Sequence, residues 1–255
     1  MLEFGFYNMD CMDGMKEFPD KYFDLAIVDP PYGIGYDIQA SKNGGKRSKN
    51  GVAKKGVYHA TNWDATIPSR EYFDELFRVS KHQVIWGGNY FSQYLPPSKG
   101  FICWDKRLKG IERSFADCEY AWVDDKMGVA RMFRYVWDGM IQENMKEKEI
   151  RIHPTQKPVA LYEWILNRYS KEGDIILDTH VGSGSSLVAC NNCGHKYVGF
   201  EIDEEYYKKA SERIEAEQRQ TSLFSVSVQC QEDQLTMDDD DFCSWGEREE
   251  DAETD

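Results

Sequence analysis

The feature that most constrains this chain is the apolar run Phe23-Asp24-Leu25-Ala26-Ile27-Val28, which ends at Asp29-Pro30-Pro31-Tyr32. An apolar run bounded by proline predicts a buried central strand. The two prolines fix φ and lack an N–H, so they end the hydrogen-bonded sheet ladder. Asp29 to Tyr32 therefore form a rigid segment, which is called the ledge below. Its carboxylate stands at the C-terminal end of a strand, where open α/β sheets bind ligands. Taken alone, the four residues are equally typical of a strand followed by a turn.

The chemistry of this ledge suits a planar ring that carries an exocyclic amino group. The Asp29 side chain and the Pro30 carbonyl can accept hydrogen bonds from the amino N–H groups, and Tyr32 can stack on the ring. Pro31 keeps the backbone extended at this point. We therefore take Asp29 to Tyr32 as the candidate catalytic segment.

A second constellation combines a strand, a glycine-rich turn and a helix. Residues 174–178 form an apolar run that ends in Asp178, and Gly182-Ser183-Gly184 follows just before a helical pattern. The glycines permit positive φ and close approach to a ligand, and a helix N-terminus offers free N–H groups. Glu201 comes 201 − 178 = 23 positions after Asp178, about the spacing at which an acid reaches ribose hydroxyls in nucleoside-binding βαβ units. The combination favours a ligand site over a plain loop.

The remaining pattern alternates strands and helices, which predicts the α/β class. We expect further strands near residues 3–10, 83–86, 100–105, 118–123 and 196–202, and helices near 12–18, after Ser69, 159–170 and 206–219. Residues 124–152 carry no signal that assigns a structure. The segment 153–158, His-Pro-Thr-Gln-Lys-Pro, directly precedes the helix near 159–170.

The net charge of −14 is concentrated in one segment. Residues 231–255 hold 12 acidic residues and one basic residue, a net charge of −11, so residues 1–230 carry −14 − (−11) = −3. We expect the acidic tail, residues 220–255, to lack fixed structure. Residues 41–56 form a basic, glycine-containing loop, for which phosphate contact is favoured over a solvated linker. Its cationic residues are Lys42, Lys46, Arg47, Lys49, Lys54 and Lys55.

Cysteine usage and hydropathy indicate the compartment. The odd number of seven cysteines argues against a complete disulfide framework, and reduced cytosolic thiols are the simpler interpretation. No apolar run approaches a membrane span and no N-terminal signal pattern is present, so we expect a cytoplasmic protein. Cys190 and Cys193 have a metal-like spacing, but no second Cys/His pair partners them, and no metal site is predicted.

Three of these motifs together resemble those of S-adenosylmethionine-dependent amino-methyltransferases that act on DNA. The motifs are Asp29 to Tyr32, His153 to Pro158 and Asp178 to Gly184, and the resemblance covers roughly residues 4–215. Their order is that of the permuted group, in which the catalytic motif precedes the cofactor motif. The resemblance implies a doubly wound, mostly parallel, seven-stranded Rossmann-like sheet with one antiparallel strand inserted near an edge. It implies a methyltransferase domain at residues 1–219, with a candidate target-recognition region at 106–152.

The resemblance also implies residue roles. Asp178 would lie near the methionine amino group of S-adenosylmethionine, the glycine turn would pass under the cofactor, and Glu201 would hold the ribose. The full set of implied cofactor-binding residues is Asp10, Cys11, Asp29, Thr155, Lys157, Asp178, Gly182, Ser183, Gly184, Glu201 and Asp203. The sequence departs from the family at Thr179-His180, where Pro-Phe is usual, and at Ser185, where Thr is usual. For His180, a packed ring is favoured over a general base.

The predicted activity is methyl transfer to the N6 amino group of adenine in double-stranded DNA after base flipping, because Asp before Pro-Pro-Tyr points to adenine in this family. Cytosine-N4 methylation stays open, since both rings present the same amino edge. A catalytically silent DNA- or clamp-binding module is the alternative from another class. A nicotinamide oxidoreductase would need a Gly-x-Gly-x-x-Gly fingerprint near the N-terminus, which is missing.

A short segment after the last predicted helix suggests a protein partner. Gln220, Leu223 and Phe224 resemble the peptide with which bacterial replication and repair proteins bind the sliding clamp, and exposed Leu and Phe would fill a partner's pocket. Burial of the two side chains against the domain is the favoured alternative. The recognised DNA site, a restriction partner and a homodimer are all left open by the sequence.

Overall fold

A computed structural model of the protein describes residues 1–43, 62–108, 116–138 and 141–220. The chain divides into two compact units, Met1–Ile214 and Glu215–Asp255. The first unit contains every element described below, apart from the end of the final helix. Within the described ranges, no helix combines the length and the apolar character needed to cross a membrane.

The first unit is built on one large sheet. Among the described residues this sheet has eight strands in the order β1-β10-β9-β2-β3-β5-β4-β6. Their bounds are β1 (Gly5–Asn8), β2 (Phe23–Val28), β3 (Ser80–Trp86), β4 (Gly100–Asp105), β5 (Cys118–Val123), β6 (Arg131–Arg134), β9 (Ile175–Asp178) and β10 (Lys196–Glu201). The strand β5 runs antiparallel to both of its neighbours, and all other neighbouring pairs are parallel. A separate two-stranded ribbon pairs β7 (Trp137–Asp138) with β8 (Ile141–Gln142).

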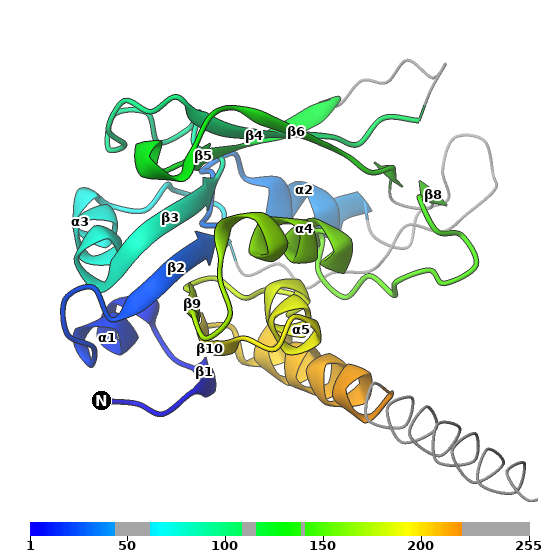
Figure 1. The fold of residues 1–255 in the computed structure, drawn as a ribbon. Helices are drawn as coiled ribbons and strands as arrows, with labels where there is room; N and C mark the ends of the chain where they lie inside the picture. Colours follow the sequence, from blue (N-terminus) through cyan, green and yellow to red (C-terminus); the bar gives the residue numbers. More distant parts are fainter. Residues whose placement is uncertain (44–61, 109–115, 139–140, 221–255) are drawn as a thin grey trace, which may run out of the picture. The chain divides into compact units, whose positions relative to one another are not determined.

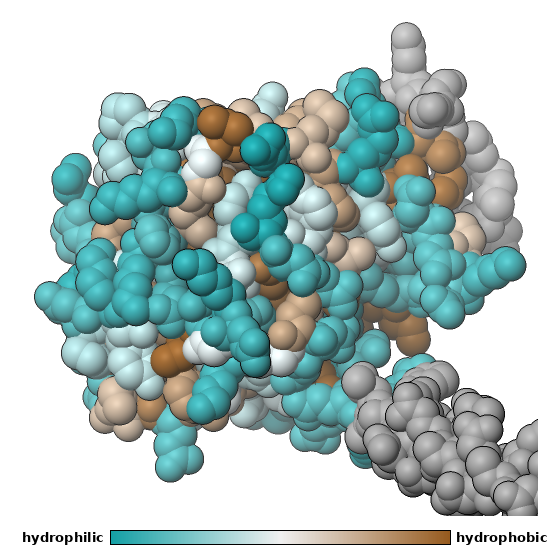
Figure 2. All heavy atoms as spheres, viewed as in Figure 1, coloured by the Kyte–Doolittle hydropathy of each residue, from teal (hydrophilic) through white to brown (hydrophobic). Residues whose placement is uncertain are grey.

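Helices cover both faces of the sheet (Figure 1). They are α1 (Cys11–Lys16), α2 (Tyr36–Asn43), α3 (Arg70–Val79), α4 (Val159–Tyr169), α5 (Ser185–Asn192), the 3-10 turn η1 (Asp125–Met127) and a final helix over residues 204–220. On β2, Leu25 and Ile27 pack in the cluster that includes α4 and α5, whereas Ala26 and Val28 pack in the cluster that includes α1 and α3. Burial on both faces explains why β2 is an uninterrupted apolar run. The face drawn in Figure 2 is mostly hydrophilic, with scattered hydrophobic side chains.

The predicted fold class is confirmed: the protein has a doubly wound, mostly parallel α/β sheet. The strand number differs from the expected seven because β6 pairs with β4 at the sheet edge. Arg131, Met132 and Arg134 of β6 are exposed, so this short strand has no apolar alternation by which the sequence could reveal it. The expected single antiparallel strand is β5, third from that edge.

Candidate active site

Four carboxylates meet at one edge of the sheet, because each follows or ends a parallel strand. Asp29 follows β2, Asp178 ends β9, Glu201 ends β10, and Asp10 stands two residues after β1. The register aligns Asn8 with Glu201 and Gly199 with Asp178, so these strand ends are neighbours. This edge is where doubly wound sheets bind ligands.

The Asp29 carboxylate is held through both of its oxygens. The Tyr32 hydroxyl donates to Oδ1 at 2.6 Å, and the Lys157 ammonium lies 2.5 Å from Oδ2. The Lys157 side chain is only 2% exposed, and its Nζ also pairs with Glu119 of β5 at 3.2 Å. Lys106 binds the other oxygen of Glu119 at 2.6 Å. Two cations and two carboxylates thus form one neutral network of ion pairs that begins at Asp29.

Burial and the neighbouring charges shift the pKa values of Lys157, Glu119 and Tyr32. Burial works against the charge of Lys157, but Asp29 and Glu119 outweigh it and raise the pKa of the ammonium. Burial likewise works against ionised Glu119, but Lys157 and Lys106 lower its pKa to about 2. Burial and the neighbouring Asp29 raise the pKa of Tyr32 well above its usual value. Lys157 is therefore a permanent cation beside the ledge, and Tyr32 remains a hydrogen-bond donor.

The Tyr32 ring is positioned by the segment that follows β3. Tyr90 stacks on it with ring centroids 4.9 Å apart and an interplanar angle of 16°. Gly87 approaches so closely that a Cβ there would lie 2.3 Å from Tyr32 Cε1, and its φ is +73°. Only glycine accommodates both conditions. Tyr90 is 41% exposed, so the stacked face opens toward the surface.

Asp64 holds the backbone of the ledge through hydrogen bonds. The sequence did not reveal this residue. Its carboxylate accepts from the backbone N–H groups of Tyr32 at 2.8 Å, Gly33 at 2.9 Å and Tyr36 at 2.9 Å. The residue is 2% exposed. Three charge-assisted bonds hold the loop between β2 and α2 in one conformation. An acid in a short loop segment is also an ordinary turn residue, so no local signal distinguishes it.

The glycine turn lies between Asp178 and Glu201. Gly182 and Gly184 have φ values of +55° and +79°, which side chains rarely adopt. Glu201 accepts from the backbone N–H of Gly182 at 2.8 Å and of Asp203 at 2.9 Å, and burial raises its pKa. Ser186 donates to buried Asp178, and the His180 backbone N–H does so at 2.9 Å. Burial, together with the charges of Asp29 and Glu201, raises the pKa of Asp178 to about 7.

Several other predicted cofactor residues have structural partners of their own. Asp10 caps α1 by accepting from Met12 N at 2.8 Å, and burial with Asp10 raises the pKa of the Cys11 thiol to about 12. Asp203 accepts from the backbone of Glu205 at 2.9 Å and Tyr206 at 3.0 Å, so it begins the final helix. The Ser183 carbonyl accepts from Arg213 at 2.9 Å, and Arg213 is paired with Glu149 at 2.7 Å. Arg213 and Glu149 thus hold the glycine turn in place, which the sequence did not suggest.

The segment His153 to Pro158 contacts both the ledge and the final helix. Lys157 reaches the ledge, whereas the Thr155 hydroxyl lies 3.0 Å from His153 Nδ1. His153 packs edge-on against Tyr206 with centroids 4.4 Å apart, and burial lowers its pKa to about 3. Lys157 therefore contacts the ledge, and its predicted contact with the cofactor stays a prediction.

His180 is a packed ring in this structure. Its centroid lies 5.4 Å from Tyr72 in an edge-on contact, and its Nδ1 lies 2.9 Å from the Thr179 hydroxyl. That hydroxyl also contacts the Tyr72 hydroxyl at 2.7 Å. Burial lowers the pKa of His180 to about 4. These contacts favour packing over general-base chemistry.

Some predicted residues lie outside the described ranges. Of the basic loop, Lys42 is described: it is exposed near the end of α2. Lys46, Arg47, Lys49, Lys54 and Lys55 fall outside, as do Leu223 and Phe224 of the clamp-like segment, whereas Gln220 ends the described part of the final helix.

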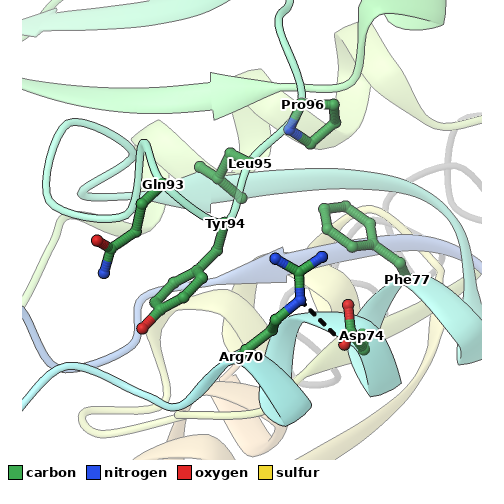
Figure 3. A pocket seen from close by; sticks show the side chains of 7 residues that line it. All are labelled: Arg70, Asp74, Phe77, Gln93, Tyr94, Leu95 and Pro96. Carbon is green, nitrogen blue, oxygen red and sulfur yellow. Dashed lines mark ion pairs between the residues drawn. The ribbon is translucent and has the colours of Figure 1, made fainter.

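The surface also has a hollow. It is lined by Arg70, Asp74, Phe77, Gln93, Tyr94, Leu95 and Pro96, from α3 and the segment after β3 (Figure 3). Its ion pair, Arg70 to Asp74 at 3.6 Å, joins two side chains that are 66% and 64% exposed. A solvated pair of this kind contributes little energy, and the hollow contains none of the predicted site residues.

The fold and the site define a class of enzyme. A glycine turn with acids at the ends of two neighbouring strands suits a nucleoside cofactor, and a carboxylate ledge beside it suits an amino group that receives a transferred group. The open glycine backbone at Gly182 and two carboxylates that can face an ammonium and a ribose fit S-adenosylmethionine. These features are those of an α/β methyltransferase.

Comparisons with known proteins narrow this class. The N6_N4 methyltransferase model, described as DNA methylase, matches residues 116–212. Type II methyltransferase M.HpaI of Haemophilus parainfluenzae is 25% identical over 82% of this chain and 73% of its own length. DNA adenine methyltransferase YhdJ of Escherichia coli K12 is 24% identical over 81% of each chain. The chain is therefore similar to N6/N4 DNA methyltransferases, and its cofactor is S-adenosylmethionine.

A solved structure shares the fold. TTHA0409 from Thermus thermophilus, described as a DNA modification methylase and solved with S-adenosyl-L-methionine, aligns with a TM-score of 0.50 at 16% identity. The alignment covers 84% of this chain and 95% of that chain. At this identity the likeness concerns the fold.

Proposed function

We propose that the protein methylates the N6 amino group of adenine in double-stranded DNA. The observation that carries this proposal is the Asp29 carboxylate, held by Tyr32 and Lys157 at the sheet edge that also carries Asp178. The choice of adenine rests on Asp preceding Pro-Pro-Tyr, which points to adenine by resemblance. The adenine methyltransferase among the relatives supports the same choice. The family model also covers N4 chemistry, so cytosine is the second candidate.

The ledge would act on a weak nucleophile. The lone pair of an exocyclic amino nitrogen is delocalised into the ring, and hydrogen bonds from its N–H groups to Asp29 and the Pro30 carbonyl favour a pyramidal nitrogen with an available lone pair. The cofactor supplies an electrophilic methyl group on a sulfonium. The nitrogen–carbon bond would form as the carbon–sulfur bond breaks, so that the sulfur leaves as a neutral thioether and the amino nitrogen passes one proton to solvent water. Positioning and electrostatics are the main catalytic contributions.

Lys157 would determine which oxygen of Asp29 accepts a hydrogen bond from the amino group. Because the ammonium binds Oδ2, the carboxylate presents Oδ1, which the Tyr32 hydroxyl occupies at 2.6 Å. An incoming amino group would share or replace that hydroxyl. A flipped base that stacks on the same face of Tyr32 as Tyr90 would have to displace the Tyr90 ring. Flipping costs a few kcal/mol, which stacking can offset.

The rest of the chain fits the same proposal. Residues 1–219 form the methyltransferase domain, residues 106–152 include its target-recognition region, and the lysines and arginine of residues 41–56 contact DNA phosphates. Implied cofactor contacts from Asp10, Cys11, Thr155, Ser183 and Asp203 belong to this proposal as well. A sliding-clamp contact through residues 220–224, homodimer formation and a cytoplasmic location are further expectations of the sequence, and no contact described above depends on them.

The experiment that tests the proposal compares Asp29→Asn with the native protein. Methyl transfer is followed in a single turnover on unmethylated DNA, and cofactor binding is measured separately by calorimetry. We expect the rate of methyl transfer to fall by at least about 100-fold, because the charged acceptor for the amino N–H is lost. The dissociation constant for the cofactor should change much less. Asp13→Asn, at a surface carboxylate 70% exposed on α1, is the matched control. Transfer by Asp29→Asn at the native rate would refute the assignment.

A further inference from the structure

Tyr90 covers one face of the Tyr32 ring. The two phenol rings lie nearly parallel, with centroids 4.9 Å apart and an interplanar angle of 16°. This is the arrangement of an offset aromatic stack, and it is also the arrangement in which a nucleobase binds an aromatic side chain. The Tyr90 ring therefore takes up space that a flat ligand of Tyr32 would need.

Tyr90 is also the more accessible of the two aromatic rings that contact Tyr32 among the described residues. Phe91 meets Tyr32 edge-on, with centroids 6.1 Å apart at 65°, and is fully buried. Tyr90, in contrast, is 41% exposed. Of these two neighbours, Tyr90 is the one that a ligand arriving from solvent can replace without opening the core.

The backbone around Tyr90 can stay in place while its side chain moves. The Tyr90 N–H donates to the Gly87 carbonyl at 2.8 Å, and the Phe91 N–H donates to the Gly88 carbonyl at 3.3 Å. Phe91 also packs on Phe73 with centroids 5.3 Å apart, which anchors this turn to the core. Because exposed side chains change rotamer rapidly, displacement of the Tyr90 ring requires no rearrangement of the fold.

We propose that Tyr90 is a placeholder for the target base: its ring occupies the stacking position on Tyr32 until a flipped base displaces it. This inference rests on the proposed function, because it concerns the base that the ledge receives. The stacking position adjoins the acceptor, since the Tyr32 hydroxyl donates to Asp29 at 2.6 Å. A nucleobase offers a larger stacking surface than a phenol ring, so a base delivered by DNA replaces Tyr90.

The placeholder raises the requirement for occupying the site. Every base must break the stack between Tyr90 and Tyr32 before it binds, and this cost is the same for all ligands. A base in DNA can offset the cost through the contacts of the protein with the phosphate backbone, whereas a free nucleoside makes no such contacts. Free nucleosides at low concentration therefore leave the stack intact.

The test is a fluorescence titration with 2-aminopurine deoxyriboside, whose emission is quenched when its base stacks on an aromatic ring. S-adenosylhomocysteine is present at saturation, so the nucleoside cannot bind in place of the adenosine part of the cofactor. We expect Tyr90→Ala to bind the nucleoside about threefold to tenfold more tightly than the native protein does, because no stack has to be broken. Damage to the fold would change the affinity in the opposite direction.

Two controls locate the effect. Tyr94→Ala removes another ring of the same segment, which stacks on Phe73 with centroids 5.2 Å apart at 28°, and it should bind the nucleoside as the native protein does. Adding Tyr32→Ala to Tyr90→Ala should abolish the gain in affinity, because the stacking partner is lost.

Equal or weaker binding by Tyr90→Ala, or no binding by either protein, would overturn the proposal. A gain that persists in the double variant would overturn it as well, because the nucleoside would then bind away from Tyr32. The titration involves neither DNA nor methyl transfer. A failure of the proposed function, seen as an absence of methylated DNA, is therefore a separate result.

Discussion

Lys157 determines what the Asp29 carboxylate can do. It sits 128 positions away in sequence, is 2% exposed, and is bound by two carboxylates rather than one. A buried ammonium of this kind holds its partners only while both remain ionised, and an unpaired member of such a group is costly. The same arrangement leaves Asp29 with one oxygen directed toward the Tyr32 hydroxyl.

Removing the ammonium should therefore destabilise the fold as well as the reaction. Lys157→Met leaves Asp29 and Glu119 without their shared cation, and we expect the free energy of unfolding to fall by about 3–5 kcal/mol. Adding Asp29→Asn should restore part of this loss, because Asp29 is the carboxylate left without a cation, whereas Glu119 keeps its pair with Lys106. Urea denaturation of the native protein, both single variants and the double variant measures the effect. A double variant less stable than Lys157→Met would contradict this account.

The proposed contact between Asp178 and the methionine ammonium would make cofactor binding depend on pH. Its pKa in the free protein is raised to about 7 by burial and by the charges of Asp29 and Glu201. The methionine ammonium needs the ionised carboxylate, so protonation competes with binding. The dissociation constant should rise by about tenfold per pH unit below pH 7. Calorimetry between about pH 5.5 and 8 checks this, and Asp178→Asn should bind weakly with little pH dependence over the same range.

The raised pKa of Asp178 also makes the stability of the folded protein depend on pH. Asp178 binds its proton more tightly in the folded than in the unfolded protein, where its pKa is about 3.9. Its favourable contribution is fully present below that unfolded value and is lost as the pH rises through about 7. A bound cofactor supplies a countercharge and should offset that loss. A cofactor affinity that is flat between about pH 5.5 and 7 would disprove the role given to Asp178.

The loops after β2 and β3 work as a pair. The first carries the ledge and is held by Asp64, and the second carries Gly87 and Tyr90 against the Tyr32 ring. Since β2 and β3 are parallel neighbours in register, their C-terminal ends lie side by side and the two loops must fit each other. The conformation of Tyr32 therefore depends on both.

Gly87→Ala should disturb base capture selectively. A Cβ at this position would lie 2.3 Å from the Tyr32 ring, and its φ of +73° is unfavourable for alanine. We expect Tyr32 to be displaced, so that DNA methylation falls by about tenfold or more while cofactor affinity is nearly unchanged. Fluorescence of 2-aminopurine placed at the target base would report the loss of flipping. Gly173→Ala is the control, because it has positive φ but open space around the Cβ position.

For the chain as a whole, the central strands and the acids at their ends could be predicted because each strand is a local apolar run. Asp29, Asp178 and Glu201 lie where the sequence placed them, at one sheet edge. The supporting residues could not be found in this way. Asp64 and Glu119 act through contacts with segments distant in sequence, and no local pattern encodes such an approach. The helix α2 and the strands β6 to β8 were missed because they are short or lack apolar periodicity.

We propose that this site transfers a methyl group from S-adenosylmethionine to adenine N6 in DNA. The most direct measurement is mass spectrometry of nucleosides from genomic DNA that lacks adenine and cytosine methylation, after incubation with the protein and isotopically labelled cofactor. We expect labelled N6-methyldeoxyadenosine with the native protein and almost none with Asp29→Asn. Labelled N4-methyldeoxycytidine would contradict the choice of base, and equal labelling by Asp29→Asn would contradict the site itself.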